Sequence, residues 1–341
     1  AGYRSSLVGK WHIGHAKENW PRTHGFDEFW GSLIGTPRFW EVKETFANET
    51  PIEVTGKGYY TDQLAAKAVE FIRRDAAAEK PFFLYLAFNA PHYPLEAPFE
   101  LVQKYRRLFP DRGLFALYAA MVERLDTGIG QVLATLDELK LAQNTLVVFT
   151  SDNGGHPEFS TNSPLRGSKW NLYEGGLRVP WIVRWPGRVP AGRVSDAPFI
   201  GTDLLPTLAA AAGAKLTRGV ALDGRDVLPL WLGSAEADPD RALTWHFPYY
   251  HPETGYAAAR PAIGVDDFAV SQTRPHSALR VGRWKFLHFY EDNRDELYDL
   301  AADPSEQRDL STADPTRTRA LRSRLESELR AQGARLPSRA E

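Results

Sequence analysis

Runs of apolar residues along the chain predict several buried strands. The longest covers residues 82–88 (FFLYLAF) and directly follows Pro81. Two further runs cover residues 145–150 and 181–185. Because these runs are continuous rather than alternating, they are typical of strands that are covered on both faces, as in a parallel sheet.

Helical periodicity lies between these strands. Thr61 is placed to cap a helix whose apolar face carries Leu64, Ala68 and Ile72. A longer pattern from Tyr118 to Leu136 repeats apolar residues at steps of three and four, which predicts a helix that leads into the strand at residue 145. Strands that alternate with helices indicate an α/β layered domain.

The pattern changes near Glu236 to short, aromatic segments separated by turns. Residues 243–247, 278–281 and 284–290 are such segments, and the two residues Gly282-Arg283 between the last two predict a hairpin. We therefore divide the chain into a main domain over residues 1–235 and a small α+β subdomain over residues 236–341.

A helix is predicted at the end of this subdomain. Asp314 and Pro315 suit its N-cap and first position, and Gly333 suits its end. Leu321, Leu325 and Leu329 recur at four-residue spacing and mark its buried face. The subdomain is thus expected to combine a small antiparallel sheet with one terminal helix.

Composition narrows the class of protein. The 341 residues carry 41 basic and 43 acidic side chains, so the formal net charge is −2 and no nucleic-acid surface is indicated. No apolar run reaches the roughly 18 residues that a membrane helix needs. The chain contains no cysteine, which excludes disulfides and a cysteine nucleophile within these residues. Because the chain begins at Ala1 rather than Met, we expect a preceding segment, and its targeting signals cannot be read here.

Four segments carry candidate chemistry, and each has a plainer alternative. Asp152 and Asn153 follow the strand at 145–150 and offer hard oxygen donors that suit Ca²⁺ or Mg²⁺, although Asp-Asn-Gly is also ordinary turn chemistry. The segment 165–180 places Lys169 among glycines, where its ammonium group can approach an anion; a solvated basic loop is the alternative.

The other two segments contain histidine. His92 lies between prolines after the apolar run 82–88, where an imidazole can donate a proton to a leaving oxygen or simply make a structural hydrogen bond. Lys10 and His12 are two residues apart, which in an extended segment places both side chains on the same face. Two cationic groups on one face can clamp an oxyanion, although this pair alone is a weak signal.

Taken together, these segments resemble the sulfatase family of the alkaline-phosphatase superfamily. The family shows Gly-Lys-Trp-His, Ala-Pro-His-x-Pro and Ser-Asp-Asn-Gly-Gly stretches, which this chain matches at residues 9–12, 90–94 and 151–155. An Arg-Gly-x-Lys segment that runs into Glu-Gly-Gly and Arg-Val-Pro is matched over residues 166–180. Further similarities lie at residues 202–207 and 296–304. The resemblance implies a mixed, mostly parallel sheet flanked by helices, with a small C-terminal antiparallel sheet plus helix.

The resemblance also implies roles for individual residues. Lys10 and Lys169 would bind the sulfate oxygens, and His12 would contact the nucleophile. His92 would protonate the departing oxygen of a sulfate monoester. Asp152 and Asn153 would supply two of the calcium ligands, with Mg²⁺ as a possible substitute. Such an arrangement suits transfer of a sulfuryl group, whose charge is spread over its oxygens.

One part of the family pattern is missing from these residues. The family's nucleophile is a Cys or Ser that becomes formylglycine in a Cys/Ser-x-Pro-x-Arg motif upstream of Gly-Lys-Trp-His, and two further aspartate ligands lie closer to the N-terminus. Neither the motif nor those ligands occur before Lys10. Two donors fall short of the six to eight oxygens that Ca²⁺ prefers. We therefore expect these 341 residues to be inactive alone and to bind calcium weakly.

Two other functions remain open on the sequence. A phosphonate or phosphate ester hydrolase of the same superfamily would use the same pocket chemistry. A catalytically dead relative that binds a sulfated glycan is the other alternative; the retained proton donor His92 argues against it. The upstream reading frame would separate these functions, because it would or would not encode the nucleophile motif.

Substrate choice is expected to depend on two loops, from Thr36 to Thr55 and from His246 to Arg274. With the adjoining Trp245 they carry aromatic side chains that can stack on a sugar or aryl ring, or pack at the rim of the core. These side chains are Trp40, Tyr249, Tyr250 and His251. By family analogy the partner is a small-molecule or glycan sulfate ester and the protein is periplasmic or secreted; the sequence does not indicate the oligomeric state.

Overall fold

The computed structural model describes residues 1–78, 80–217, 219–248 and 275–337. The chain forms two compact units: unit 1 comprises residues 1–146 and 185–188, and unit 2 comprises residues 147–184 and 189–341. This division does not coincide with the domain boundary expected between residues 235 and 236, which stays a prediction.

Unit 1 is built on a five-stranded sheet with the order β4-β3-β2-β1-β5. Strand β1 (Arg4–Lys10) lies between β2 (Glu28–Ser32) and β5 (Phe82–Ala87) and runs parallel to both. The short strands β3 (Thr45–Ala47) and β4 (Thr50–Pro51) extend the sheet antiparallel beyond β2. The carboxyl ends of β1, β2 and β5 therefore lie at one edge of the sheet.

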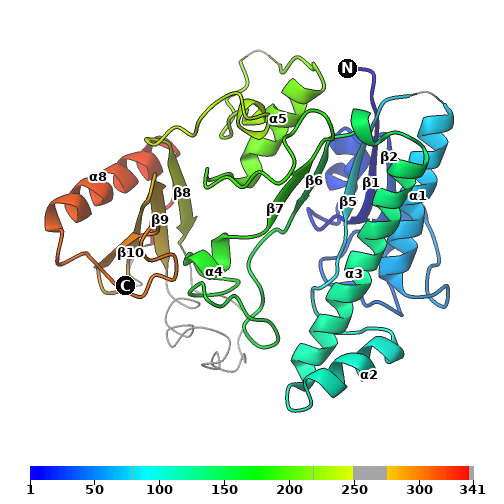
Figure 1. The fold of residues 1–341 in the computed structure, drawn as a ribbon, viewed down its shortest axis with the longest axis horizontal. Helices are drawn as coiled ribbons and strands as arrows, with labels where there is room; N and C mark the ends of the chain where they lie inside the picture. The colour runs from blue at the N-terminus through cyan, green and yellow to red at the C-terminus, as the bar shows by residue number, and fades with distance from the viewer. Residues whose placement is uncertain (79, 218, 249–274, 338–341) are drawn as a thin grey trace. The chain divides into compact units, whose positions relative to one another are not determined.

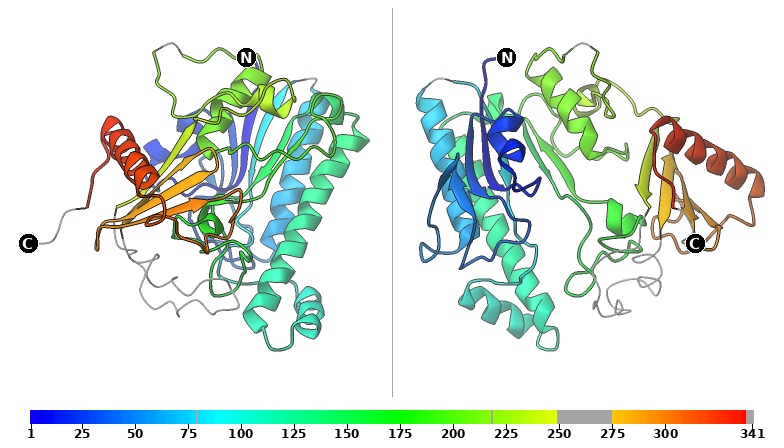
Figure 2. Two further views of the ribbon diagram at one scale, coloured as in Figure 1. Left: turned by 60° about the vertical axis from the view of Figure 1, so that its left-hand side comes forward. Right: turned by 180° about the vertical axis from the view of Figure 1, so that it is seen from behind.

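Two long helices pack side by side on this sheet (Figures 1 and 2). They are α1 (Tyr60–Ala77), whose residues Leu64 and Phe71 join Val8 in the core, and α3 (Gly113–Glu138). Both helices were predicted from their periodicity and are confirmed. The remaining helical elements of unit 1 are α2 (Phe99–Leu108), η1 (Lys17–Asn19), η2 (Pro21–His24) and η3 (Ala142–Asn144).

Two local predictions for unit 1 are wrong. Thr61 does not cap α1: the N-cap is Tyr59, without a side-chain hydrogen bond, and Thr61 is buried inside the helix. The run at 82–88 does form β5, but it is not covered on both faces, because Phe83 and Tyr85 are 40% and 51% exposed. The continuous run predicted the strand correctly and its burial incorrectly, because Phe83 and Tyr85 are two residues apart and share one face of β5, which is the exposed one.

Unit 2 contains two antiparallel sheets. Strands β6 (Val147–Thr150) and β7 (Trp181–Arg184) pair with each other. The second sheet has the order β11-β10-β9-β8, and its hairpin between Val281 and Trp284 confirms the predicted one. Its strands are β8 (Ala242–Phe247), β9 (His276–Val281), β10 (Trp284–Phe289) and β11 (Arg294–Asp299). The helical elements are α4 (Glu174–Leu177), η4 (Gly201–Asp203), α5 (Leu204–Ala211), α6 (Leu228–Trp231) and α8 (Pro315–Ala331).

The terminal helix α8 covers one face of the four-stranded sheet, as predicted (Figure 2). Asp314 caps it by accepting a hydrogen bond from the backbone N–H of Arg317 at 3.0 Å. Its three spaced leucines are buried against the apolar side chains of the strands. The residues in this cluster are Leu321, Leu325, Leu329, Leu279, Phe286 and Leu297.

The other face of the same sheet holds the segment that leads into α4. Leu172 and Tyr173 are buried there together with Leu287 and Phe289. The segment that contains Lys169 is therefore anchored on the C-terminal sheet through the residues that follow it. In the parts of the chain that the structure describes, no helix is long and apolar enough to cross a membrane.

Candidate active site

Lys10 is the last residue of β1, and the chain turns sharply after it. The backbone N–H groups of Trp11 and His12 donate to the carbonyl oxygens of Ser32 and Leu33, at 3.0 and 3.2 Å. His12 has φ 59°, in the left-handed region. The expectation that an extended backbone aligns Lys10 and His12 is therefore wrong, because the strand ends between them. The side chain of His12 is exposed, whereas that of Lys10 is half-buried.

Three glycines permit the close packing at this edge of the sheet. A Cβ atom at Gly9 would overlap the carbonyl oxygen of Ala87, and one at Gly31 would overlap that of Gly9. A Cβ atom at Gly35 would overlap the imidazole ring of His12. Side chains larger than hydrogen at these positions would push β1, β2, β5 and the His12 ring apart.

His92 follows β5 at the same edge of the sheet as Lys10. Gly9 and Ala87 are paired in the parallel register, so the segments after β1 and β5 leave the sheet together. The Nδ1 atom of His92 lies 2.8 Å from the carbonyl oxygen of Tyr93. Because a carbonyl oxygen only accepts, Nδ1 carries the hydrogen, and Nε2 is the nitrogen that can exchange a proton with a substrate.

The His92 loop is held by the loop that begins at Thr36. Glu96 accepts hydrogen bonds from the Phe39 backbone N–H at 2.8 Å and from Nε of Arg38 at 2.9 Å. Tyr59 donates its hydroxyl to the Glu96 carbonyl oxygen at 2.7 Å, and burial raises the pKa of Tyr59, which keeps it a donor. The expected specificity loop is thus attached directly to the loop that carries His92.

In unit 2, Asp152 and Asn153 lie just beyond the carboxyl end of β6, as expected from the sequence. The Nδ2 group of Asn153 donates to the carbonyl oxygen of Gly154 at 2.8 Å, so Oδ1 is the side-chain atom that can bind a cation. A carboxylate and an amide oxygen suit a hard cation such as Ca²⁺. Within the described ranges, no three His, Cys, Asp or Glu side chains are grouped to hold a metal. The two side chains are of the type that binds calcium, but two ligands are fewer than the six to eight oxygens that Ca²⁺ prefers.

The Lys169 loop packs against the Asp152 turn through one asparagine that sequence reasoning missed. The backbone N–H of Lys169 donates to the carbonyl oxygen of Gly155 at 3.1 Å. Asn162 accepts from the N–H of Gly155 at 2.8 Å and donates to the carbonyl oxygens of Gly155 and Gly167, each at 3.2 Å. Nothing in the local sequence indicates this role of Asn162, because its hydrogen-bond partners at Gly155 and Gly167 are backbone groups.

Backbone contacts also join the turn to α4. The N–H of Gly154 donates to the carbonyl oxygen of Gly176 at 3.0 Å, and the N–H of Gly175 donates to that of Arg166 at 2.6 Å. A Cβ atom at Gly154 would overlap the carbonyl oxygen of Gly175. The Ser-Asp-Asn-Gly-Gly, Arg-Gly-x-Lys and Glu-Gly-Gly motifs are therefore three parts of one packed backbone cluster.

Arg166 is held inside this cluster and is not part of a solvated basic loop. Its Nη1 atom donates to the hydroxyl of Tyr298 at 2.8 Å and to the carbonyl oxygen of Glu306 at 3.1 Å. Its guanidinium group lies 4.0 Å from the centre of the Tyr173 ring. Lys169 is half-buried and lies over the ring of Trp170 at 5.3 Å.

The structure thus forms two groups of candidate residues. Lys10, His12 and His92 share one sheet edge in unit 1, and Asp152, Asn153 and Lys169 share one backbone cluster in unit 2. The convergence of the two groups on one anion stays a prediction.

The aromatic candidates for substrate recognition differ in position. Trp40 is 43% exposed and lies against Tyr59, with ring centres 5.1 Å apart. Trp245 packs at the rim of the unit 2 core. The predicted contributions of Tyr249, Tyr250 and His251, and of the loop that ends at Arg274, lie outside the described residues.

Comparison with known proteins assigns the family. The sulfatase family profile matches residues 1–214, and the N-sulphoglucosamine sulphohydrolase C-terminal profile matches residues 168–335. The N-acetylgalactosamine-6-sulfatase of Canis lupus familiaris is 37% identical over 258 residues, which are 70% of this chain and 48% of that protein. The steryl-sulfatase of Mus musculus is 35% identical over 306 residues, which are 83% of this chain and 46% of that protein.

Solved structures agree with the sequence comparison. The structure of Ps i-CgsB in complex with k-i-k-neocarrahexaose has a TM-score of 0.82 at 29% identity, covering 95% of this chain and 71% of that one. The putative sulfatase yidJ from Bacteroides fragilis has a TM-score of 0.72 at 20% identity, and the match covers 98% of this chain and 76% of that one. The chain belongs to the sulfatase family and has the alkaline-phosphatase-like fold expected from its motifs. It spans about half the length of the curated relatives that it matches.

Proposed function

We propose that this chain is part of a calcium-dependent sulfuric ester hydrolase. The observation that carries the proposal is the backbone cluster of unit 2, in which the N–H of Lys169 is bonded 3.1 Å from Gly155, next to Asp152 and Asn153. This contact brings the backbone of Lys169 to the turn that carries Asp152 and Asn153, which supports a site that combines one cation with two hard oxygen donors. Family membership supplies the reaction class.

The two lysines would hold the sulfate group. Lys169 belongs to the unit 2 cluster, whereas Lys10 and His12 lie at the end of β1 in unit 1, and the proposal requires both groups to reach the same sulfate. Charge on a sulfuryl group in transfer is spread over its oxygens, so fixed cations stabilise the transition state more than the ester. Both lysines are half-buried, where an ion pair with an anion is less screened than at the surface.

His92 would protonate the leaving oxygen. Its Nδ1–H is committed to the carbonyl oxygen of Tyr93, so the proton would leave from Nε2. This hydrogen bond fixes the orientation of the imidazole ring. An alcohol with a high pKa needs this proton most, because an alkoxide is a poor leaving group.

Calcium would be held in part by the Asp152 carboxylate and the Oδ1 atom of Asn153. When bound, the cation would supply Lewis-acid stabilisation of the sulfate oxygens. These residues provide two of the six to eight oxygens that Ca²⁺ prefers, so ligands from outside them must complete the site. A formylglycine nucleophile is likewise expected from outside these residues, which contain no cysteine.

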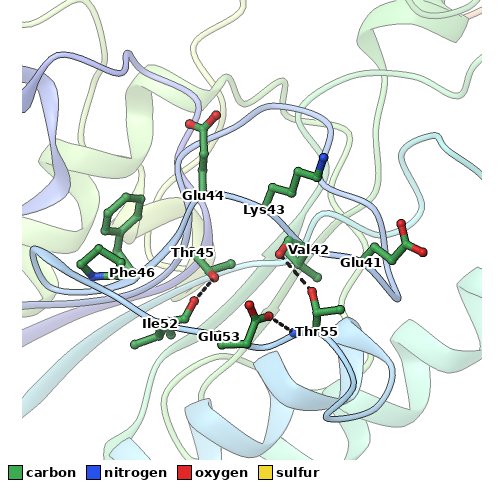
Figure 3. Close-up of a pocket in the computed structure, with 10 residues that line it drawn as sticks. Glu41, Val42, Lys43, Glu44, Thr45, Phe46, Ile52, Glu53 and Thr55 are labelled. Atoms are coloured by element: carbon green, nitrogen blue, oxygen red, sulfur yellow. Dashed lines mark hydrogen bonds between the residues drawn. The ribbon is translucent and has the colours of Figure 1, made fainter.

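We propose that the substrate is a sulfated carbohydrate and that the loop from Thr36 to Thr55 binds its sugar. The canine relative is named for a saccharide, N-acetylgalactosamine, and Ps i-CgsB was solved in complex with k-i-k-neocarrahexaose. An open cavity of about 550 Å³ lies in this loop, where Thr45 donates to the Ile52 carbonyl oxygen and Glu53 accepts from the Thr55 N–H (Figure 3). Carboxylates and carbonyl groups suit sugar hydroxyls, which donate hydrogen bonds. The cavity is lined by Glu41, Val42, Lys43, Glu44, Thr45, Phe46, Pro51, Ile52, Glu53 and Thr55.

The experiment that tests the function uses the full-length parent protein, read from the DNA upstream of the codon for Ala1. It is assayed on N-acetylgalactosamine-6-sulfate, a carrageenan oligosaccharide, a steryl sulfate and a phosphate monoester, with a Lys169→Ala variant as the control. Release of sulfate from a saccharide, lost in the control, supports the proposal. Turnover of the phosphate ester alone would favour the other hydrolase class, and no turnover with retained glycan binding would favour a binding protein. Recovery from the periplasm or medium would support the proposed export.

A further inference from the structure

A buried ion cluster lies behind the Lys169 loop. Lys285 of β10 is fully buried, and its Nζ atom lies 2.9 Å from Oε1 of Glu174 and 2.8 Å from Oε1 of Glu306. Glu174 begins α4 and is 3% exposed, and Glu306 follows β11 and is fully buried. Three segments that are far apart in the sequence thus meet at one ammonium group.

The two carboxylates of this cluster differ in their pKa values. Two carboxylates face Lys285, while Arg280 of β9 and Arg178, which follows α4, add positive charge nearby. Burial raises the pKa of Glu306 to about 7. The pKa of Glu174 is lowered because, against the effect of its burial, Lys285 favours the charged form. The cluster is therefore expected to hold one ionised carboxylate at Glu174 and a proton on Glu306 in mildly acidic solution.

The cluster is connected to the candidate anion site by a short chain of hydrogen bonds. Oε2 of Glu306 accepts from the backbone N–H of Glu174 at 2.6 Å, which fixes the first residue of α4. The next two residues, Gly175 and Gly176, bond to Arg166 and Gly154. Asp152 and Lys169 lie within three residues of those two positions. Every step of this path is within unit 2.

We propose that Lys285 is a positioning residue: by holding Glu174 and Glu306 it fixes α4, and through α4 it fixes the turn of Asp152 and the loop of Lys169. This positioning role rests on the proposed function in one respect only: the anion-binding role of the Lys169 loop is taken from that function. Stability alone is a weak reason for such a cluster, because well-packed apolar side chains replace buried ion pairs at little cost. The surrounding sheet offers that apolar packing on both faces.

Hydrogen–deuterium exchange of the 341-residue chain tests the positioning role. Lys285→Met is compared with the wild type and with Lys215→Met, a matched change at an exposed lysine of unit 2. We expect exchange in peptides covering residues 152–155 and 166–178 to rise at least about tenfold in Lys285→Met. Exchange in β8–β11 and α8 should stay within about twofold, and Lys215→Met should match the wild type. Unchanged exchange at 152–178 in a folded Lys285→Met protein overturns the proposal.

A second variant keeps the test decisive if Lys285→Met unfolds, since an unpaired buried carboxylate is strongly destabilising. The triple variant Lys285→Met, Glu174→Gln, Glu306→Gln removes the lysine and both carboxylate charges together. We expect it to fold and still to show raised exchange at residues 152–155 and 166–178. Wild-type exchange in the folded triple variant, or exchange raised uniformly over unit 2, would show that the cluster has no positioning role.

Titration with inorganic sulfate separates this proposal from the proposed function. We expect the wild-type 341-residue chain to bind sulfate and the Lys169→Ala variant to lose sulfate binding. The Lys285 variants should bind sulfate at least about tenfold more weakly than the wild type. Raised exchange without any sulfate binding by the wild type would support the positioning role and contradict the anion site. Equal sulfate affinity in wild type and Lys285 variants would contradict the positioning role while leaving the anion site intact.

Discussion

Gly35 lies directly against the imidazole ring of His12, so closely that a Cβ atom at Gly35 would overlap the ring. Gly35→Ala must therefore displace the His12 side chain. A displacement of about 1 Å in an active-site group costs on the order of 10²-fold in rate, and we expect that loss in kcat/KM of the parent protein. Steady-state kinetics on a sulfate ester measures it.

The matched control for this change is Gly130→Ala. Gly130 lies inside α3, and a Cβ atom there meets nothing within 4 Å. Alanine should stabilise that helix by about 0.5–1 kcal/mol and leave kcat/KM unchanged. Equal kcat/KM for Gly35→Ala and Gly130→Ala would show that the position of the His12 side chain does not affect catalysis.

His92→Gln tests the proton donor. Glutamine preserves the approximate size and polarity of the side chain but cannot supply an acidic proton. We expect kcat to fall about 10²–10⁴-fold for an alkyl or sugar sulfate and much less for an activated aryl sulfate, whose phenolate leaves without protonation. The measurement is the dependence of kcat on leaving-group pKa. A uniform loss across all leaving groups would point instead to a structural role for His92.

The sequence predicts the elements that depend on local pattern. Helix α8 is an example, because Asp314 caps it and its leucines repeat at helical spacing. The error at α1 has a tertiary cause: Thr61 is a suitable cap by type, but Tyr60 is buried in the core and is already helical. The N-cap is therefore Tyr59, two residues earlier than predicted. The short strands β3 and β4 carry too few residues to show a period and were not predicted.

The chemistry was predicted where family motifs name the residue, and missed where only the fold creates the contact. Lys285 stands between Trp284 and Phe286 in a strand, and no local pattern pairs it with Glu174, which is 111 residues away. Asn162 binds backbone groups and has no motif. The left-handed backbone of His12 depends on its hydrogen bond to Leu33, which the sequence Lys-Trp-His does not reveal.

Glu306→Gln tests the charge state of the buried cluster through the pH dependence of stability. The pKa of Glu306 is raised from 4.5 to about 7, so the folded state binds its proton more tightly than the unfolded state does. This contribution to stability is fully present below pH 4.5 and is lost as pH rises to about 7, by up to about 3 kcal/mol. Glu306→Gln should remove that decline.

Denaturant unfolding of the wild type and Glu306→Gln between pH 4.5 and 8 measures the effect. Titrations elsewhere in the chain are common to both proteins and cancel in the difference. We expect the difference in the free energy of unfolding to move in favour of Glu306→Gln as pH rises. A difference that is flat with pH would show that Glu306 has an ordinary pKa.

Calcium should affect the parent protein and the 341-residue chain very differently. The chain offers Asp152 and Asn153, so millimolar Ca²⁺ should raise its Tm by no more than a degree or two. In the parent protein, Ca²⁺ should raise Tm markedly and chelation should abolish activity. Asp152→Asn in the parent should weaken Ca²⁺ binding about tenfold or more. Strong calcium stabilisation of the chain alone would contradict the expected shortage of ligands.

A crystal structure of the parent protein with a bound inorganic sulfate ion would show whether both lysines hold the same anion. We expect one tetrahedral anion within hydrogen-bonding distance of the Nζ atoms of both Lys10 and Lys169, with Nε2 of His92 facing the same ion. An anion bound to only one of the two lysines, with the other too far away to reach it, would contradict the account.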